Sequence, residues 1–174
     1  MISKQQLLDS MKHETEVIKH LATKVPQDQY DYRPTQKQRS TGELMQYLTQ
    51  MAIVPARNAI TGSWDHAEEY ATRAEESTPE TFDADMDRQM NEIAGVFAEI
   101  DESEATTKPA ATPWGTPTTV AAGLMDMALK CFVAYRMQFF LYIKASGVTD
   151  IGPANCWAGI DQPPSEEADE TENS

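Results

Sequence analysis

The chain has 174 residues, and its 28 acidic side chains outnumber its 14 basic ones, which gives a formal net charge of −14. This length is typical of one domain that buries roughly two thirds of its unfolded surface. The acidic balance argues against sequence-independent binding to nucleic acid and against docking on an anionic membrane, because both need basic residues.

The N-terminal residues MISKQQLLDS lack the basic, apolar and small-residue pattern of a signal peptide. Charged residues, among them Asp126 and Lys130, interrupt the one long apolar segment too often for a membrane span. The two cysteines, Cys131 and Cys156, are too few for a disulfide framework. We therefore expect a soluble, cytoplasmic protein.

The first helix is predicted to begin at a capping box formed by Ser3 and Gln6 and to end at Pro26. Its apolar residues recur at helical spacing: Leu7, Met11, Ile18, Leu21 and Val25. His13 and His20 flank this stripe but lie two turns apart, about 10 Å along the axis, which is too far for both to bind one ion directly. We interpret them as partly packed boundary residues.

A polar connector, residues 27–39, precedes a second capping box formed by Ser40 and Glu43. The helix that follows has an apolar stripe of Leu44, Tyr47, Leu48, Met51 and Val54 or Pro55. Pro55 should kink or divide it, because proline lacks the backbone donor and clashes one turn back. Residues 64–76, which contain His66 without an obvious partner, read as a short polar helix. A third long helix should start at Thr78, and residues 102–113 should form a loop.

The longest helix is predicted over residues 117–147, with Thr116 and Pro117 at its start and Gly147 as its stop. Its apolar stripe comprises Val120, Leu124, Met127, Ala128, Cys131, Ala134, Tyr135, Gln138 and Tyr142. A helix with so long a stripe needs other helices to cover it. The sequence therefore predicts an all-α fold, a four-helix bundle with a short extra helix and a C-terminal extension.

The extension after Gly147 should pack on the end of the bundle through Ile151 and Trp157. Residues 161–174 are acidic and poor in large apolar side chains, so we expect a disordered tail. The predicted organisation is one helical domain, residues 1–160, followed by this tail.

Two segments resemble the DinB-like superfamily. RPTQKQRSTGELMQYLTQM resembles the entry to that superfamily's second helix, and CFVAYRMQFFLYIKASG resembles the H-x-x-x-H-R-G-Q…Y-L-R…G pattern of its last helix. The dipeptide WG before the last helix and NCWAG after it are also similar, so the resemblance covers most of residues 1–160. It implies a DinB/YfiT-like four-helix bundle, often dimeric. Many members hold a divalent metal with three histidines, which supports thiol-dependent transferase or isomerase chemistry in some branches.

In this chain the three histidine positions hold Tyr47, Cys131 and Tyr135, while Arg136 and Gln138 of the motif remain. Phenols and a thiol must lose protons before they bind a metal well, so we expect a degenerate metal site with no metal and no cofactor. The three side chains either fill the core or line a pocket for a small ligand, with Arg136 and Gln138 supporting it. We assign no catalytic residue.

Two functions follow from this interpretation. The favoured one is a metal-free bundle that binds a small ligand or a partner at Tyr47, Cys131 and Tyr135. The alternative is a thiol-dependent transferase or isomerase that uses the same pocket, with Cys131 as a possible nucleophile. The aromatic residues Phe139, Phe140 and Tyr142 place apolar side chains around much of the last helix. This predicts a homodimer, unless two faces of that helix pack within one bundle.

Overall fold

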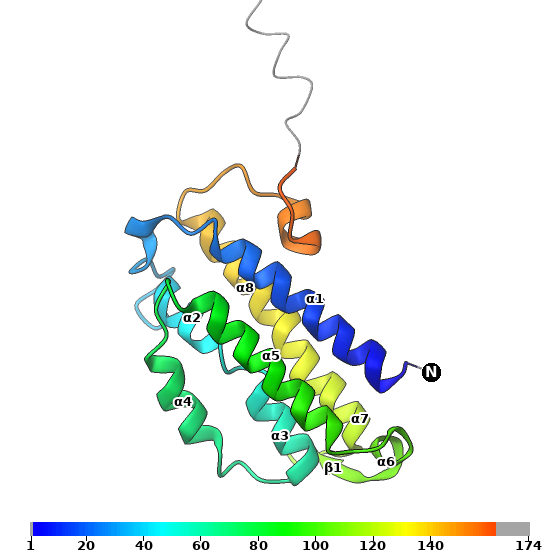
Figure 1. Ribbon diagram of the computed structural model, residues 1–174. Helices are drawn as coiled ribbons and strands as arrows, with labels where there is room; N and C mark the ends of the chain where they lie inside the picture. The colour runs from blue at the N-terminus through cyan, green and yellow to red at the C-terminus, as the bar shows by residue number, and fades with distance from the viewer. Residues whose placement is uncertain (1, 163–174) are drawn as a thin grey trace, which may run out of the picture.

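The computed structural model, which describes residues 2–162, is mostly helical and confirms the all-α four-helix bundle (Figure 1). Two of the four long members are single helices, α1 (Lys4–Ala22) and α5 (Phe82–Ala98). The other two are composite. One consists of α2 (Thr41–Leu48) and α3 (Ile53–Thr61), and the other of α7 (Val120–Gly123), the π-helical turn η2 (Leu124–Leu129) and α8 (Lys130–Ala145). None of the helices in residues 2–162 is long and apolar enough to cross a membrane.

Shorter elements connect or cover the long ones: η1 (Gln27–Gln29), α4 (Ala67–Glu75), α6 (Glu102–Thr107), the antiparallel strands β1 (Pro109–Ala111) and β2 (Pro117–Thr119), and the π-helical turn η3 (Ala154–Ala158). The prediction of a loop over residues 102–113 is therefore wrong. The local sequence favours a helix only weakly, but α6 is stabilised by tertiary packing, because Ala105 is buried.

The predicted start of the last helix is wrong by three residues. Pro117 lies in β2, opposite Ala111, and not at the first helical position. Thr119 is the N-cap, and its side chain accepts a hydrogen bond from the backbone N–H of Ala122. The predicted stop is confirmed, because Gly147 has the left-handed φ of 109° that favours glycine after a helix end.

Both predicted capping boxes are present. The Ser3 hydroxyl accepts from the Gln6 N–H while the Gln6 side chain accepts from the Ser3 N–H, and Ser40 and Glu43 repeat the arrangement. Pro55 divides the second helix, as predicted. It is the third residue of α3, where a backbone N–H has no partner within the helix in any case.

Gln89 of α5 closes the break between α2 and α3. Its Oε1 accepts from the N–H groups of Ala52 (2.9 Å) and Ile53 (3.3 Å), and its Nε2 donates to the Leu48 carbonyl (2.9 Å). The side chain is fully buried. A buried carboxamide therefore satisfies the backbone groups that the helix break leaves open.

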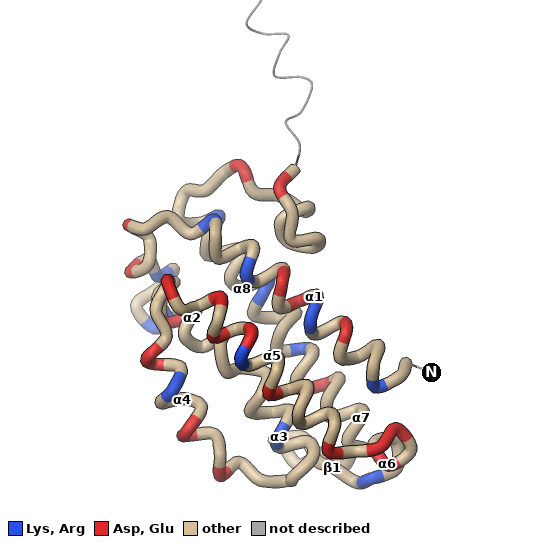
Figure 2. The backbone as a smooth tube through the Cα atoms, in the orientation of Figure 1, with Lys and Arg blue, Asp and Glu red and all other residues tan. Residues whose placement is uncertain are grey.

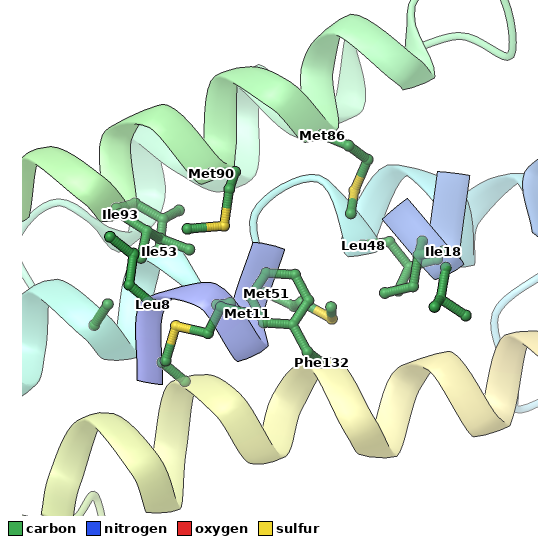
Figure 3. Packing of buried hydrophobic residues seen from close by; sticks show 14 of the residues in the cluster. Leu8, Met11, Ile18, Leu48, Met51, Ile53, Met86, Met90, Ile93 and Phe132 are labelled. Carbon is green, nitrogen blue, oxygen red and sulfur yellow. The ribbon is translucent and has the colours of Figure 1, made fainter. Parts of the chain in front are cut away.

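The four members enclose one continuous apolar core (Figure 3). α1 contributes Met11 and Ile18, α2 contributes Leu48, α5 contributes Met86 and Ile93, and α8 contributes Phe132. Met51 and Ile53 fill the space beside the helix break.

The π-helical turn η2 changes which residues of the last helix face this core. The buried side chains are Val120, Leu124, Ala128, Phe132, Arg136, Phe139, Tyr142 and Ile143, so the predicted positions Val120, Leu124, Ala128 and Tyr142 are confirmed. The predicted stripe instead continued through Cys131, Tyr135 and Gln138, which lie at the edge and are half-buried. Because a π-turn takes an extra residue, every later position is rotated by one residue relative to a regular helix.

The C-terminal extension packs on α1 and α8, but not as predicted in detail. Ile151 is buried, whereas Trp157 is 62% exposed and its neighbour Cys156 is buried instead. Gly159 has a φ of 65°, and a Cβ there would lie 3.2 Å from the Cα of Val17, so this position favours glycine. Residues 163–174, most of the predicted tail, lie outside the described residues.

Replacing Gln89 with Leu should destabilise the protein by about 1–3 kcal/mol, because the Leu48 carbonyl and the Ala52 N–H would be buried without partners. Chemical denaturation measures the change. Asn91→Leu on the exposed side of α5 is the matched control and should shift the free energy of unfolding by less than about 0.5 kcal/mol. Equal stability of the two variants would contradict this role of Gln89.

Candidate functional site

The structure brings the three predicted site residues together between α2 and α8. Tyr47, in the last turn of α2, packs edge-on against Tyr135 of α8, with ring centroids 4.8 Å apart and an interplanar angle of 62°. Cys131 lies one turn before Tyr135 and lines the same groove as Tyr47. Edge-on packing of this kind is a favourable arrangement of two aromatic rings.

Arg39 also contacts this cluster, which the sequence does not predict. Its guanidinium carbon lies 4.0 Å from the centroid of the Tyr47 ring, a cation–π contact. Arg39 comes from the connector directly before the Ser40 cap. No spacing rule links a connector residue to a helix position eight residues later, so only the folded loop reveals the contact.

Burial keeps the side chains of Tyr47 and Cys131 uncharged. Burial, followed by hydrogen bonding to Tyr135, raises the pKa of Tyr47, although the charge of Arg39 partly opposes the shift. Burial also raises the pKa of Cys131. Metal binding requires the deprotonated forms of both groups. The residues present therefore do not fit the divalent metal that the family resemblance implies.

A groove with a volume of about 390 Å³ opens beside Tyr47 and Cys131. Its walls come from α2, the α2–α3 break, α3, α4 and the last helix, and the larger side chains include Tyr47, Gln50, Val54, Trp64, Met127 and Cys131. Every residue that lines it is uncharged. Tyr135 is not part of the wall and packs against Tyr47 instead.

Gln138 and Arg136 do not support this groove, contrary to the prediction. The Gln138 amide donates to the Tyr142 hydroxyl at 3.3 Å, and Tyr142 packs edge-on against Tyr32. Arg136 is only 1% exposed and points toward α1. It follows Tyr135 by one residue, which is about 100° around the helix.

Arg136 instead forms a buried ion pair with Glu14 of α1. The Nε–Oε2 distance is 2.9 Å, but the geometry is not that of a hydrogen bond. Nη1 of Arg136 donates to the Cys156 carbonyl at 2.5 Å, and the Trp157 ring stacks 4.5 Å from the guanidinium carbon. Arg136 thus ties the C-terminal extension to α1 and α8.

Each of the three histidines has a ring nitrogen in contact with a residue from another segment of the chain. The Nε2 atom of His13 lies 2.9 Å from the Trp157 carbonyl, and that of His66 lies 3.2 Å from the Val54 carbonyl. His20 contacts Asn155 at 3.1 Å, and burial lowers its pKa. Within residues 2–162, no three His, Cys, Asp or Glu side chains gather in a group that could hold a metal ion.

Arg136→Met should cost about 3–5 kcal/mol near neutral pH, because it leaves the Glu14 carboxylate buried without its counter-charge. Burial already raises the pKa of Glu14, and losing Arg136 should raise it further. A raised carboxyl pKa favours folding at low pH, so the deficit relative to wild type should shrink as the pH falls toward about 4.3.

Denaturation curves recorded from pH 7 downward test this prediction. The Glu14→Gln/Arg136→Met double variant is the control, since it has no carboxylate to protonate and its deficit should not change with pH in this way. A deficit of the single variant that is equally large at both ends of the range would contradict the assignment.

No protein-family model and no curated protein matches the sequence. Two crystal structures match the fold. A DinB-like protein of Bacillus subtilis has 17% sequence identity and a TM-score of 0.63, with 84% of this chain and 95% of that chain covered. A candidate member of the DinB family from Exiguobacterium sibiricum has 19% identity and a TM-score of 0.64, with 87% and 96% covered. The chain therefore has the DinB-like four-helix fold that its sequence motifs predict.

Proposed function

We propose that this protein binds a small, uncharged and largely apolar molecule in the groove beside Tyr47 and Cys131, without a catalytic metal. The observation that carries the proposal is the groove itself. All of its lining residues are uncharged, although the chain has 28 acidic and 14 basic residues.

The lining favours a ligand of this class. A charged ligand would lose its hydration in the groove without meeting an opposite charge, which is costly. Arg39 does not compensate, because its guanidinium stacks on the Tyr47 ring and is not part of the groove wall. Trp64, which is 42% exposed, offers a flat aromatic surface, and Gln50 offers a carboxamide.

The charge and the thiols of the chain bear on its partners and its location. With a net charge of −14 the chain should not bind nucleic acid, and we expect it to associate as a homodimer. Its two cysteines are free thiols, which suits a cytoplasmic protein. We propose that residues 1–160 form the functional domain and that residues 161–174 form a separate acidic tail.

The neutral fluorophore N-phenyl-1-naphthylamine tests the groove. Its emission should rise on binding, and the tryptophan emission of the protein should fall because Trp64, one of its three tryptophans, lines the groove. Ala71→Phe should weaken binding at least tenfold, about 1.4 kcal/mol, because Ala71 lines the groove and the larger ring fills it. Thr72→Phe, one residue along α4 and exposed, is the matched control and should bind like the wild type. Equal affinities of the two variants would place the probe elsewhere.

The alternative, a thiol-dependent transferase or isomerase, has one observation in its favour: Cys131 lines the groove. A nucleophilic cysteine needs a lowered pKa and a nearby base, whereas burial raises the pKa of this thiol. We therefore expect iodoacetamide near neutral pH to alkylate Cys131 more slowly than a free model thiol. Cys131→Ser gives the background from Cys156. Reaction faster than the model thiol would favour the enzyme.

A further inference from the structure

The C-terminal extension is held on the bundle mainly by polar contacts. From the end of α8 the chain turns back and lies beside α1 (Figure 1). We call residues 152–161, which contain η3, the strap. Only two of its side chains, Asn155 and Cys156, are buried, whereas Trp157 and Ile160 are 62% and 57% exposed. Because the strap buries so little apolar surface, its attachment depends on each polar contact.

Asn155 makes the central contact between the strap and α1. Its Oδ1 accepts a hydrogen bond from the Gly152 N–H (2.8 Å), which fixes the orientation of the carboxamide. The two N–H groups of Nδ2 are therefore left for Oδ1 of Asp161 (2.9 Å) and Nε2 of His20 (3.1 Å). An N–H group can donate only to a ring nitrogen that has no proton. Nε2 of His20 is thus the acceptor, and the ring is neutral.

His13, two turns earlier on α1, contacts the strap in the opposite sense. Its Nε2 lies 2.9 Å from the Trp157 carbonyl oxygen, which can only accept, so this ring nitrogen has a proton. A second proton on the His13 ring goes to Nδ1 and leaves that hydrogen bond in place. At His20 the added proton goes to Nε2 and sets two N–H donors against each other. Protonation therefore breaks the His20 contact and leaves the His13 contact intact.

An ion pair also joins the strap to the end of α1. Basic residues lie along α1, whereas residues 148–161 of the extension include acidic residues and no Lys or Arg (Figure 2). Lys24 pairs with Asp161, with an Nζ–Oδ1 distance of 2.6 Å. The Asp161 side chain is 66% exposed, so water and salt screen this pair and it adds little to the attachment.

Lys24 and Asp161 are also the charged groups that face His20. Asp161 lies 3.6 Å from Nε2 and favours a protonated ring, whereas Lys24 disfavours it and already neutralises the exposed carboxylate. The pKa of His20 is lowered from its ordinary value, with burial as the largest cause. The ring therefore takes up a proton more readily once the strap has left. It follows that acid favours release from about pH 6.5 downward.

We propose that residues 152–161 form a pH-sensitive strap, which stays on α1 while His20 is neutral and leaves it when His20 takes up a proton. Departure withdraws the Cys156 carbonyl from Arg136 and exposes the Cys156 thiol, a side chain that is 2% exposed while the strap is bound. The inference is independent of the proposed groove ligand, because no strap residue lines that groove.

Thiol reactivity measures the release. In Cys131→Ser the only thiol is that of Cys156, and dithiodipyridine reacts with thiols on both sides of the ordinary histidine pKa. Relative to N-acetylcysteine at the same pH, the rate should rise roughly fivefold between about pH 7.5 and about pH 5.5. His20→Gln should abolish the rise, because its carboxamide oxygen accepts from Asn155 and does not titrate. His13→Gln, whose amide can still donate to the Trp157 carbonyl, is the matched control and should keep the rise.

Asn155→Asp should reverse the direction of the pH dependence. A carboxylate at this position cannot donate to neutral His20, but it accepts from the protonated ring. It also lies beside the Asp161 carboxylate and is repelled until that proton arrives. In this variant the relative rate at Cys156 should fall as the pH falls. A change in the same direction as in the starting protein would overturn the role of Asn155.

Cys131, measured in Cys156→Ser, shows whether acid loosens the whole bundle. Its relative rate should stay constant over the same pH range, because Cys131 lies outside the strap. Three results would overturn the proposal: a constant rate at Cys156, a rise at Cys156 that survives in His20→Gln, or a parallel rise at Cys131. Probe binding in the groove, recorded on the same samples, tests the proposed ligand separately.

Discussion

The structure depends on the rotational phase of its last helix. From Val120 to Ala145 this helix must cover the other members of the bundle along its whole length, and η2 sets which side does so. After the π-turn, Phe132 and Phe139 face the core. Cys131 lies on one flank, toward α2, and Met137 lies toward solvent. One extra residue in a helical turn therefore determines which residues of the last helix face the core, which line the groove and which face solvent.

The chemistry of the groove follows from this phase. Cys131 and Tyr135 meet Tyr47 at a half-buried edge, where desolvation favours neutral side chains. The charged neighbour in sequence, Arg136, turns away and pairs with Glu14. The side chains beside the groove thus fill space and offer weak polar contacts, an arrangement that suits the recognition of an uncharged molecule better than the binding of an ion.

Local signals in the sequence were sufficient for much of the fold. The capping boxes at Ser3 and Ser40, the break near Pro55 and the stop at Gly147 all depend on residues close in the chain. The proximity of Tyr47, Cys131 and Tyr135 followed from the family resemblance.

Features that depend on contacts between residues far apart in the sequence could not be predicted. The π-turn has no signature in the apolar spacing, so the predicted stripe is one residue out of phase with the observed core from Cys131 to Gln138. Gln89 and Arg136 are buried polar residues whose partners, Leu48 and Glu14, lie on other helices.

Tyr47, Cys131 and Tyr135 pack together at the positions where the family resemblance implies a metal, and we expect this protein to hold none there. Elemental analysis of protein purified without chelator tests this expectation. We expect far less than one equivalent of any divalent transition metal, unchanged in Cys131→Ser. Near-stoichiometric zinc or nickel that is lost in this variant would contradict it.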